Sequence, residues 1–224
     1  MHSPQCVGII LDGNRRWAKK KDISALEGHR EGAERLKECI AWCISRTIGH
    51  LVVYAFSTEN WQRPNEEVSY LMELMQAAIV EEASGLIKKG VRVQFVGQRE
   101  KFSPEMQKQI RGLENESAAN TALTLWICLS YGGRAEIVAA ARAATENGGE
   151  LTEESFAKNL WTAGMPDPDI VIRTGGRHRI SNFLLWQSAY SEIFFLDTLW
   201  PDFSESEFDQ VLKEFEERTR TFGI

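Results

Sequence analysis

The sequence lacks the features that define several common classes of protein. It has no basic surplus, because 26 Lys and Arg residues face 32 Asp and Glu residues and give a formal net charge of −6. A general nucleic-acid binder would carry the opposite balance, so we expect no nucleic-acid partner. Neither a G-x-G-x-x-G pattern nor a Walker loop is present, which argues against classical dinucleotide or P-loop binding.

Long apolar runs and paired cysteines are also missing. No apolar run approaches the ~20 residues needed to cross a membrane, and the amino terminus does not resemble a signal peptide. The four cysteines, Cys6, Cys39, Cys43 and Cys128, show no metal-site spacing. A shared helix face at Cys39 and Cys43 favours core packing over a disulfide. We therefore expect a cytoplasmic protein with reduced, buried thiols that contacts the inner face of the membrane only peripherally.

What is present, first of all, is an apolar run that ends in a polar turn. The run from Cys6 to Leu11 predicts a buried strand, and Asp12-Gly13-Asn14 is typical of a turn into a helix. Such a turn presents backbone N–H groups to an anion, and Asp12 offers an oxygen ligand to a hard cation such as Mg²⁺. The alternative is a buried strand whose Asp12 only caps the next helix.

Strand and helix patterns alternate along the whole chain. This order predicts one α/β domain over residues 1–224, built on a mostly parallel six-stranded sheet flanked by helices. We expect strands at 6–11, 51–56, 91–96, 123–130, 170–172 and 193–196, and helices at 16–21, 28–46, 65–89, 104–119, 135–146, 152–160 and 204–220. The helix at 65–89 is apolar over a wide face, as expected either of a core helix or of one wall of an apolar tunnel.

Two further polar stretches follow predicted strands. Residues 57–64 hold Ser57, Asn60 and Arg63, and residues 173–182 hold two glycines among several arginines. Arginine forks match phosphate oxygens, and glycine lets the backbone approach a ligand closely. We interpret the second stretch as an anion-binding loop; the first reads equally as a plain polar loop. His29 at the start of a helix is either a capping or packing residue or a catalytic one.

These stretches together resemble the cis-prenyltransferase family, and within it the bacterial members. The resemblance rests on motifs that occur in order from about Val7 to Gly223. They are Asp12-Gly13-Asn14-x-Arg16-Trp17-Ala18, Gly28-His29-x-x-Gly32, Tyr54-Ala55-Phe56-Ser57-x-Glu59-Asn60-Trp61-x-Arg63-Pro64, Tyr131-Gly132-Gly133-Arg134, Arg173-Thr174-Gly175-Gly176 and Arg179-Ile180-Ser181-Asn182-Phe183-Leu184-Leu185-Trp186-Gln187.

The resemblance implies a reaction. Isopentenyl diphosphate would be added repeatedly, with new cis double bonds, to an allylic diphosphate such as farnesyl diphosphate. The product would be a long-chain polyprenyl diphosphate such as undecaprenyl diphosphate, the precursor of a lipid carrier for cell-wall polysaccharide. The first turn would hold the allylic diphosphate, the arginine loop would hold isopentenyl diphosphate, and an apolar tunnel between helices and sheet would hold the growing chain.

The resemblance also implies residue roles, an Mg²⁺ cofactor and a homodimer. Asp12 and Asn60 are expected at the reacting centre, and Asp12 and Glu192 as metal ligands. The residues expected to bind substrates are Gly13, Asn14, Arg15, Arg16, Trp17, His29, Ser57, Thr58, Glu59, Trp61, Arg63, Arg173, Arg179 and Ser181.

Four positions depart from the usual bacterial pattern. Arg15 replaces a common Gly, Ala25 a diphosphate-binding Arg, Arg177 an acidic residue, and Thr221 the Arg of a C-terminal Arg-x-Gly signature. We expect activity to survive these changes, with Arg15 or Arg177 compensating for a lost phosphate contact. The alternatives are a synthase with a shorter product and a non-catalytic partner subunit of the same family.

Overall fold

Six strands form a single sheet in which every neighbouring pair runs parallel. The computed structural model describes residues 3–146 and 150–218. The strand order is β3-β4-β2-β1-β5-β6. The strands are β1 (Cys6–Ile10), β2 (His50–Ser57), β3 (Val91–Val96), β4 (Leu123–Tyr131), β5 (Ile170–Arg173) and β6 (Glu192–Phe195). The predicted α/β class and six-stranded parallel sheet are confirmed.

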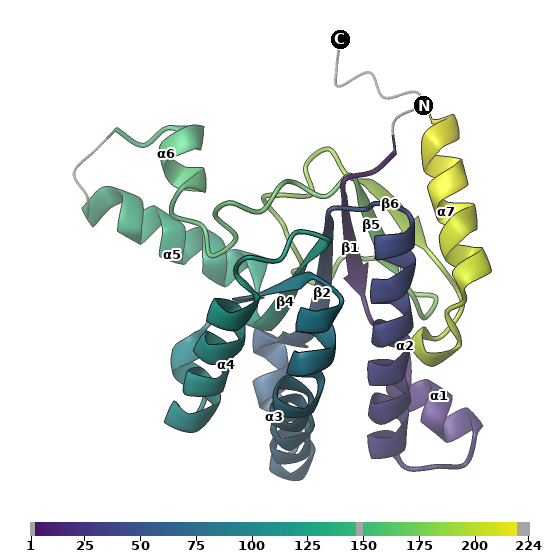
Figure 1. Cartoon of the computed structure of the whole chain (residues 1–224). Coiled ribbons are helices and arrows are strands. Elements are labelled where there is room, and N and C mark those ends of the chain that lie inside the picture. Colours follow the sequence, from purple (N-terminus) through teal and green to yellow (C-terminus); the bar gives the residue numbers. More distant parts are fainter. Residues whose placement is uncertain (1–2, 147–149, 219–224) are drawn as a thin grey trace.

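Helices α1 to α6 lie in the connections between strands, as parallel pairing requires, and α7 follows the last strand. They are α1 (Asn14–Lys20), α2 (Ala25–Ser45), α3 (Asn65–Lys88), α4 (Pro104–Ser117), α5 (Gly133–Glu146), α6 (Glu153–Ala157) and α7 (Glu205–Glu217), with short 3₁₀ turns η1 (Thr58–Gln62), η2 (Arg99–Lys101) and η3 (Trp200–Asp202). In Figure 1, α2, α3, α4 and α7 stand on one side of the sheet, and α5 and α6 extend away from it.

Strand β1 shows how the two faces of the sheet are filled. Its residues alternate, so that Val7 and Ile9 join the large core beneath the helices, whereas Cys6 and Ile10 join a second core on the other face. Phe183, from the segment after β5, covers the second face. Because both faces are buried, β1 reads as a continuous apolar run.

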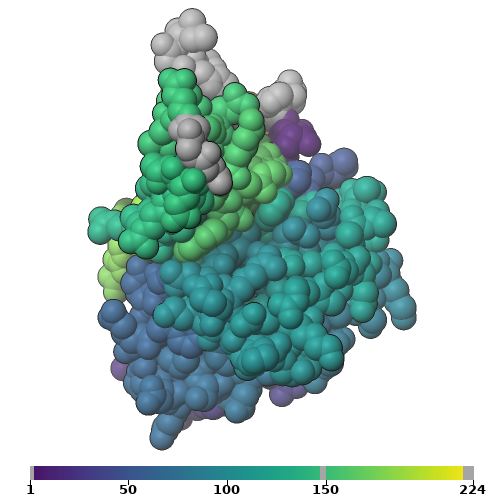
Figure 2. Space-filling model, turned by 90° about the vertical axis from the view of Figure 1, so that its left-hand side faces the viewer, coloured from purple at the N-terminus to yellow at the C-terminus, as the bar shows by residue number. Residues whose placement is uncertain are grey.

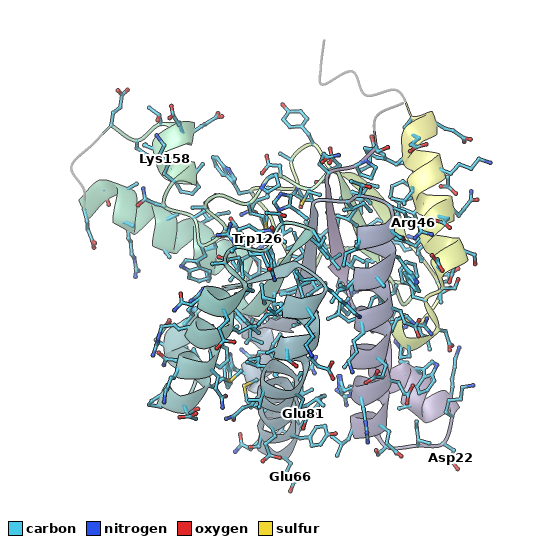
Figure 3. All side chains as sticks on the ribbon, in the orientation of Figure 1. Asp22, Arg46, Glu66, Glu81, Trp126 and Lys158 are labelled. Carbon is cyan, nitrogen blue, oxygen red and sulfur yellow. The ribbon has the colours of Figure 1, made fainter. Side chains whose placement is uncertain are left out.

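The arm made by α5 and α6 has a small apolar cluster of its own. Ala140, Phe156 and Leu160 are buried together, with Trp186 packed against them. Figure 2 shows this arm, in green, standing out beside the blue and teal body that contains α3 and α4. In Figure 3, Glu66 and Glu81 of α3 point away from the sheet, while Trp126 lies inside the fold. Among the described helices, none is long and apolar enough to cross a membrane.

The observed helix ends correct three predictions. Helix α2 begins at Ala25 rather than near residue 28, because Ser24 and Glu27 form a reciprocal capping box. Helix α1 begins at Asn14, and its N-cap residue is Gly13 at φ 127°, with no side-chain cap. The interpretation of Asp12 as a helix cap is therefore wrong. Residues 147–149, between two of the predicted helices, and Thr221 lie outside the described residues.

All four cysteines are buried and free, as expected. Burial raises the pKa of the Cys6 thiol well above its ordinary value, with nearby Asp169 adding to the effect. The pKa of the Cys128 thiol is raised by burial too, and then by Glu136. A thiol that stays protonated is a poor nucleophile and a poor metal ligand. These cysteines are packing residues.

Candidate active site

The predicted polar stretches meet at one edge of the sheet. Asp12 follows β1, η1 follows β2, and Arg173 ends β5. Because β1 lies between β2 and β5, the carboxyl ends of these three strands are neighbours. They surround a cavity of about 660 Å³. Its lining includes Asp12, Asn14, His29, Ser57, Glu59, Asn60, Arg63, Arg173, Arg179 and Ser181, all of which the sequence predicts.

Asp12 lies at the centre of this edge and joins the two arginine motifs. One carboxylate oxygen accepts a hydrogen bond from Arg16 Nη2 at 3.1 Å, and the other accepts one from Arg173 Nη2 at 2.9 Å. These pairs link the turn after β1 to the loop after β5. Asp12 is thus an ion-paired carboxylate at the mouth of a cavity, a position that suits metal or phosphate chemistry better than helix capping.

Arg173 is the most deeply buried cation of the site, with only 5% of its side chain exposed. Its Nη1 donates to Ser181 Oγ at 2.6 Å and to the Arg179 carbonyl at 2.5 Å. The Nε group has no hydrogen-bond partner among the described residues. A buried, unpaired donor is costly, which favours its use by a bound ligand.

The arginine loop approaches the first turn closely at Gly175. This residue has φ 87°, and a Cβ atom there would lie 2.9 Å from the Asp12 carbonyl oxygen and against the Arg16 guanidinium. Thr174 Oγ1 donates to the same carbonyl at 2.8 Å. Glycine is therefore required for contact between the two motifs.

A second polar cavity of about 350 Å³ opens beside the first. Its lining consists of Leu11, Asp12, Gly13, Asn14, Arg15, Arg16, His29 and Arg63. Glu67 of α3 pairs with Arg63 Nη1 at 3.0 Å and with Arg15 Nη1 at 3.5 Å, and only 15% of its side chain is exposed. Sequence reasoning missed Glu67, although its i,i+4 spacing from Arg63 is a usable signal.

The Gly28-His29-x-x-Gly32 motif seats α2 against α1. A Cβ atom at Gly28 would lie 2.5 Å from the Asn14 carbonyl oxygen and 2.8 Å from Ala18 Cβ. The motif brings His29 to the junction of the cavities, and its Nε2 has no hydrogen-bond partner within the described part of the chain. Burial, and then the positive charge of Arg63, lowers the pKa of His29 to about 4. The lowered pKa favours the neutral form of His29 at neutral pH.

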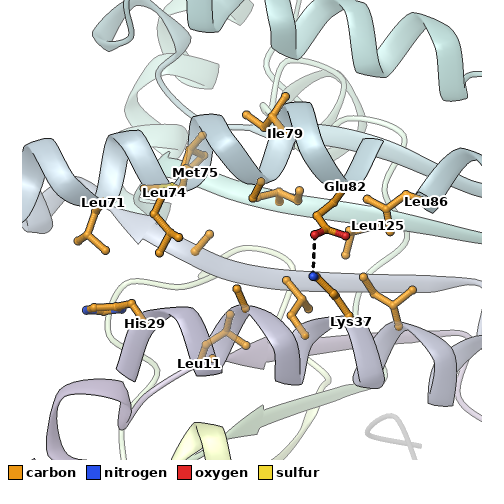
Figure 4. A pocket seen from close by; sticks show the side chains of 18 of the residues that line it. Leu11, His29, Lys37, Leu71, Leu74, Met75, Ile79, Glu82, Leu86 and Leu125 are labelled. Atoms are coloured by element: carbon orange, nitrogen blue, oxygen red, sulfur yellow. Dashed lines mark ion pairs between the residues drawn. The ribbon is translucent and has the colours of Figure 1, made fainter. Parts of the chain in front are cut away.

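An apolar cavity of about 200 Å³ continues from the polar mouth between α2, α3 and the sheet. Leu11, Asn14, His29, Ala55 and Leu71 line both the apolar cavity and the larger polar one. Figure 4 shows the apolar cavity, with His29 near one end and Leu86 near the other. The remaining apolar lining comes mainly from Leu36, Ile40, Leu74, Met75, Ala78, Ile79, Leu125, Ile127 and Leu129. The predicted apolar tunnel is confirmed, and α3 is one of its walls.

Four predicted site residues do not line the polar cavities. Trp61 donates to Ser130 Oγ at 2.9 Å and packs against the Phe56 ring, and Trp17 donates to Asp202 at 2.7 Å. Thr58 bonds to the neighbouring Glu59. The structure thus gives these three side chains protein partners outside the lining of the polar cavities. Asn182, which donates to Glu59 at 2.8 Å, is a lining residue that the prediction of site residues omitted.

Glu192 is the fourth, and it lies at the opposite edge of the sheet. It pairs in register with Ile170, which in turn is level with Val7, whereas Asp12 lies five residues further along. At ~3.3 Å per residue this is about 16 Å along the strand direction. Glu192 instead pairs with Arg218 Nη1 at 2.5 Å. Within one chain the structure does not bring Glu192 and Asp12 together as ligands of one metal ion.

The donor set at the mouth fits Mg²⁺ only together with a phosphate. Across the described residues, no group of three or more His, Cys, Asp or Glu side chains is placed to hold a metal ion. Mg²⁺ is commonly bound through one or two carboxylates plus substrate phosphates and waters. Asp12 supplies one carboxylate, and the arginines around it supply the charge to hold phosphate groups. The residues present therefore fit such a metal site.

The departures from the family pattern differ in how close they lie to the site. Arg15 lines the smaller polar cavity, so its added charge is at the site. Ala25 is the first residue of α2 and lines none of the three cavities, so it provides no phosphate contact. Arg177 is exposed in the loop after β5.

Comparison with known proteins points in one direction. The family model described as putative undecaprenyl diphosphate synthase matches residues 10–223. The isoprenyl transferase of Fusobacterium nucleatum is 46% identical over 221 residues, which cover 98% of this chain and 96% of that protein. A probable undecaprenyl diphosphate synthase from Campylobacter jejuni superposes over the full length of both chains, with a TM-score of 0.87 and 33% identity. The lavandulyl diphosphate synthase of Lavandula x intermedia, solved with dimethylallyl diphosphate, covers 99% of both chains, with a TM-score of 0.94 and 32% identity.

Proposed function

The chain belongs to the undecaprenyl diphosphate synthase family of isoprenyl transferases, and from this membership we propose that it extends an allylic diphosphate by repeated addition of isopentenyl diphosphate. It is an isoprenyl transferase. The specific primer we propose is farnesyl diphosphate, and the product is a long-chain polyprenyl diphosphate such as undecaprenyl diphosphate, with cis double bonds.

The observation that carries this proposal is the continuity between a cationic mouth and an apolar tunnel. The mouth holds Arg15, Arg16 and Arg63 beside Asp12, and the tunnel begins at Leu11 and Leu71 in the same wall. A prenyl diphosphate has an anionic head and a hydrocarbon tail, and the site offers each part its own surface. Every CH₂ that enters the tunnel contributes about 0.8 kcal/mol of burial, which favours continued growth over release.

The two arginine motifs divide the substrates between them. We assign the allylic diphosphate to the cavity lined by Arg15, Arg16 and Arg63, and isopentenyl diphosphate to Arg173, Arg179 and Ser181. In the reaction, the allylic C–O bond breaks and its electron pair leaves with the diphosphate. The double bond of isopentenyl diphosphate forms the new C–C bond, and a proton is lost from carbon. Bringing the two carbons together is the main task of such a site.

The chain's own residues contribute binding, orientation and charge. Arg16 stabilises the charge that develops on the departing allylic diphosphate, because it lines the same cavity as Arg15 and Arg63 and lies beside Asp12. Arg173, on the other side of Asp12, holds isopentenyl diphosphate. Asn60 accepts a hydrogen bond from the Ser57 amide at 3.1 Å, which holds the turn after β2 in place. Neutral His29 presents an unpaired nitrogen at the junction of mouth and tunnel. We propose Asp12 as the protein ligand of Mg²⁺, which supplies positive charge to the diphosphates when bound.

We further propose that the active form is a homodimer that works in the cytoplasm. The exposed apolar residues Val138 and Leu151 support dimerisation, since they lie on and beside the projecting arm. The four reduced thiols are in keeping with a reducing compartment. Light scattering tests the dimer: a mass near the 25.4 kDa of one chain contradicts it.

The deciding experiment is incubation of the pure protein with farnesyl diphosphate, labelled isopentenyl diphosphate and Mg²⁺. We expect extended products, whose length is read by mass spectrometry. Products only a few units long favour the alternative of a shorter-chain synthase. No products from the chain alone, but products after mixing with a candidate partner chain, favour the non-catalytic subunit. No product in either case rejects the proposal.

A further inference from the structure

One ion pair crosses the wall of the apolar tunnel. Lys37 Nζ of α2 lies 2.6 Å from Glu82 Oε1 of α3, and both residues line the cavity. Figure 4 shows the pair reaching across the space between the two helices, well away from His29. The other lining side chains in this region, such as Ile40, Ile79 and Leu86, are apolar.

The Lys37–Glu82 pair is distinctive because it joins helix α2 to helix α3. Among the described residues it is the only ion pair between α2 and α3. Pairing with Glu82, and then with Glu34, raises the pKa of Lys37 above its ordinary value. The two side chains are 34% and 38% exposed, and pairs with that much exposure contribute little to overall stability. Overall stability therefore does not explain why this ion pair lies in the wall of an apolar tunnel, so we looked to the tunnel itself for its role.

The tunnel must widen to hold a long product. Its volume of about 200 Å³ is only slightly larger than the ~150 Å³ cavity that accommodates one benzene molecule. The strand side of the tunnel is fixed, since Leu125 and Leu129 are buried within β4, which is paired on both sides, with β3 and β2. Helix α3 is held more loosely: of its 24 residues only Leu71 and Ile79 are buried. Widening thus means movement of α3 away from α2.

We propose that the Lys37–Glu82 ion pair is a clasp that holds α3 to α2 and limits the length of the prenyl product. While the pair is closed, the tunnel resists further widening, and elongation stops when the hydrocarbon fills the space available. Opening the clasp lets α3 move outward and admits further isoprene units. This inference rests on the proposed elongating function, and it assigns a specificity-determining role to two residues outside the diphosphate site.

The test uses three variants that remove charge with little change in size. Glu82→Gln and Lys37→Met each break the clasp, and the double variant removes both charges. Either single substitution already removes the contact between Lys37 and Glu82. The double variant should therefore have the same effect on product length as either single variant. The matched control is Glu34→Gln, since Glu34 bonds to the same Lys37 Nζ at 2.9 Å but belongs to α2 and does not line the tunnel.

The first readout is the length distribution of products from farnesyl diphosphate and excess isopentenyl diphosphate, measured by mass spectrometry. We expect Glu82→Gln, Lys37→Met and the double variant to shift the main product by at least one isoprene unit to greater length, and Glu34→Gln to match the wild type. Unchanged lengths overturn the clasp. So does a shift in the Glu34→Gln control, or a double variant whose shift is the sum of the single ones.

The second readout does not depend on catalysis. Amide hydrogen exchange in residues 74–86, measured without substrate, should be faster in the two single clasp variants and unchanged in Glu34→Gln, because α3 separates from α2 more often. Equal exchange in these three variants and the wild type overturns the clasp. If the wild type makes no polyprenyl product while exchange responds as expected, the elongating function fails and the clasp between the helices stands. Thermal unfolding of each variant confirms that it is folded.

Discussion

The mouth of this site is lined mainly by charged and polar side chains, and the tunnel mainly by apolar ones. At the mouth, Asp12 pairs with Arg16 and Arg173, and Glu67 pairs with Arg15 and Arg63. In the tunnel, among the residues that the structure describes, the one ion pair is that of Lys37 and Glu82, and most of the other lining side chains are apolar. The mouth is a network in which each of these charges has a protein partner, whereas the tunnel wall makes contacts that have no preferred direction.

This difference separates recognition of the head from measurement of the tail. In the reaction that we propose, a diphosphate enters the mouth and binds arginines that carboxylates already hold in place. We therefore expect the arginines to need little reorientation when the diphosphate binds. In the tunnel, affinity grows in proportion to the area buried. We therefore expect the arrangement of the arginines to select the diphosphate head, and the volume of the tunnel to limit the length of the hydrocarbon tail.

The largest effect should come from breaking the network at Asp12. We expect Asp12→Asn to lower kcat/KM by about 10³-fold, because it removes the proposed metal ligand and releases two arginines from their partner. Steady-state rates with farnesyl diphosphate measure this. Asp209→Asn is the control, since Asp209 pairs with Arg46 away from the site and its loss should leave rates unchanged. An Asp12→Asn enzyme within about tenfold of the wild type contradicts the assignment.

The next test asks whether the mouth depends on the shape of arginine or only on its charge. Arg173 contacts Asp12 and Ser181 at the same time, which the point charge of lysine does not reproduce. We expect Arg173→Lys to raise KM for isopentenyl diphosphate about 10- to 100-fold, equivalent to one charge-assisted hydrogen bond of ~1.5–3 kcal/mol. Arg99→Lys removes a comparable fork to Glu114 outside the site and should leave KM as it is. An unchanged KM in Arg173→Lys argues for charge alone.

A smaller effect concerns pH at the junction of mouth and tunnel. His29 has a folded-state pKa of about 4, below its usual value near 6.5, so the unfolded chain binds more protons between these values. Stability should therefore fall as the pH drops below about 6.5, by about 2 kcal/mol at pH 5. Urea unfolding at pH 7 and pH 5 measures this, and the difference should be smaller in His29→Gln. An equal acid loss in both proteins contradicts the assignment to His29.

The last comparison is between two glycines, one at each end of the site, and it includes the smallest expected effect, that of Gly85→Ala. Gly85 in α3 has nothing within 4 Å of the position that an alanine methyl group would take, so Gly85→Ala should stabilise the protein by ~0.5–1 kcal/mol through helix propensity. Gly28 contacts the Asn14 backbone, and Gly28→Ala should destabilise by ~1–3 kcal/mol through overpacking. Urea midpoints give both values. The same sign for the two substitutions contradicts the contrast between a closely packed mouth and a loosely held tunnel wall.

The sequence predicted the sheet well because parallel strands leave a strong signal. A strand buried on both faces is apolar throughout, as in Cys6–Ile10, and polar residues follow it at the functional edge. The predicted start of α2 was wrong because it rested on the apolar stripe of the helix alone. The capping signature Ser24-x-x-Glu27, which lies upstream of that stripe, marks the true start.

The sequence predicted which residues gather at the site, but not the hydrogen bonds that join them. Motifs identified Asp12, Arg16 and Arg173 as members of one site, but no local pattern shows that one carboxylate bridges two arginines 157 residues apart (173 − 16). Glu67 was missed because a glutamate at the exposed start of a helix is ordinary. Glu192 was placed at the site by analogy alone, and strand register shows that it belongs to the other edge.

The position of β1 in the sheet has a consequence for how the protein is made. β1 leaves the ribosome first, but its neighbour β5 comes far later, and Arg173 follows Asp12 by 161 residues. At roughly 5–20 residues per second, the nascent chain waits on the order of ten seconds for this partner. During that time β1 pairs only with β2, and its other edge stays open to unwanted strand pairing. The open edge of residues 6–10 is therefore covered only after residues 170–173 have been synthesised.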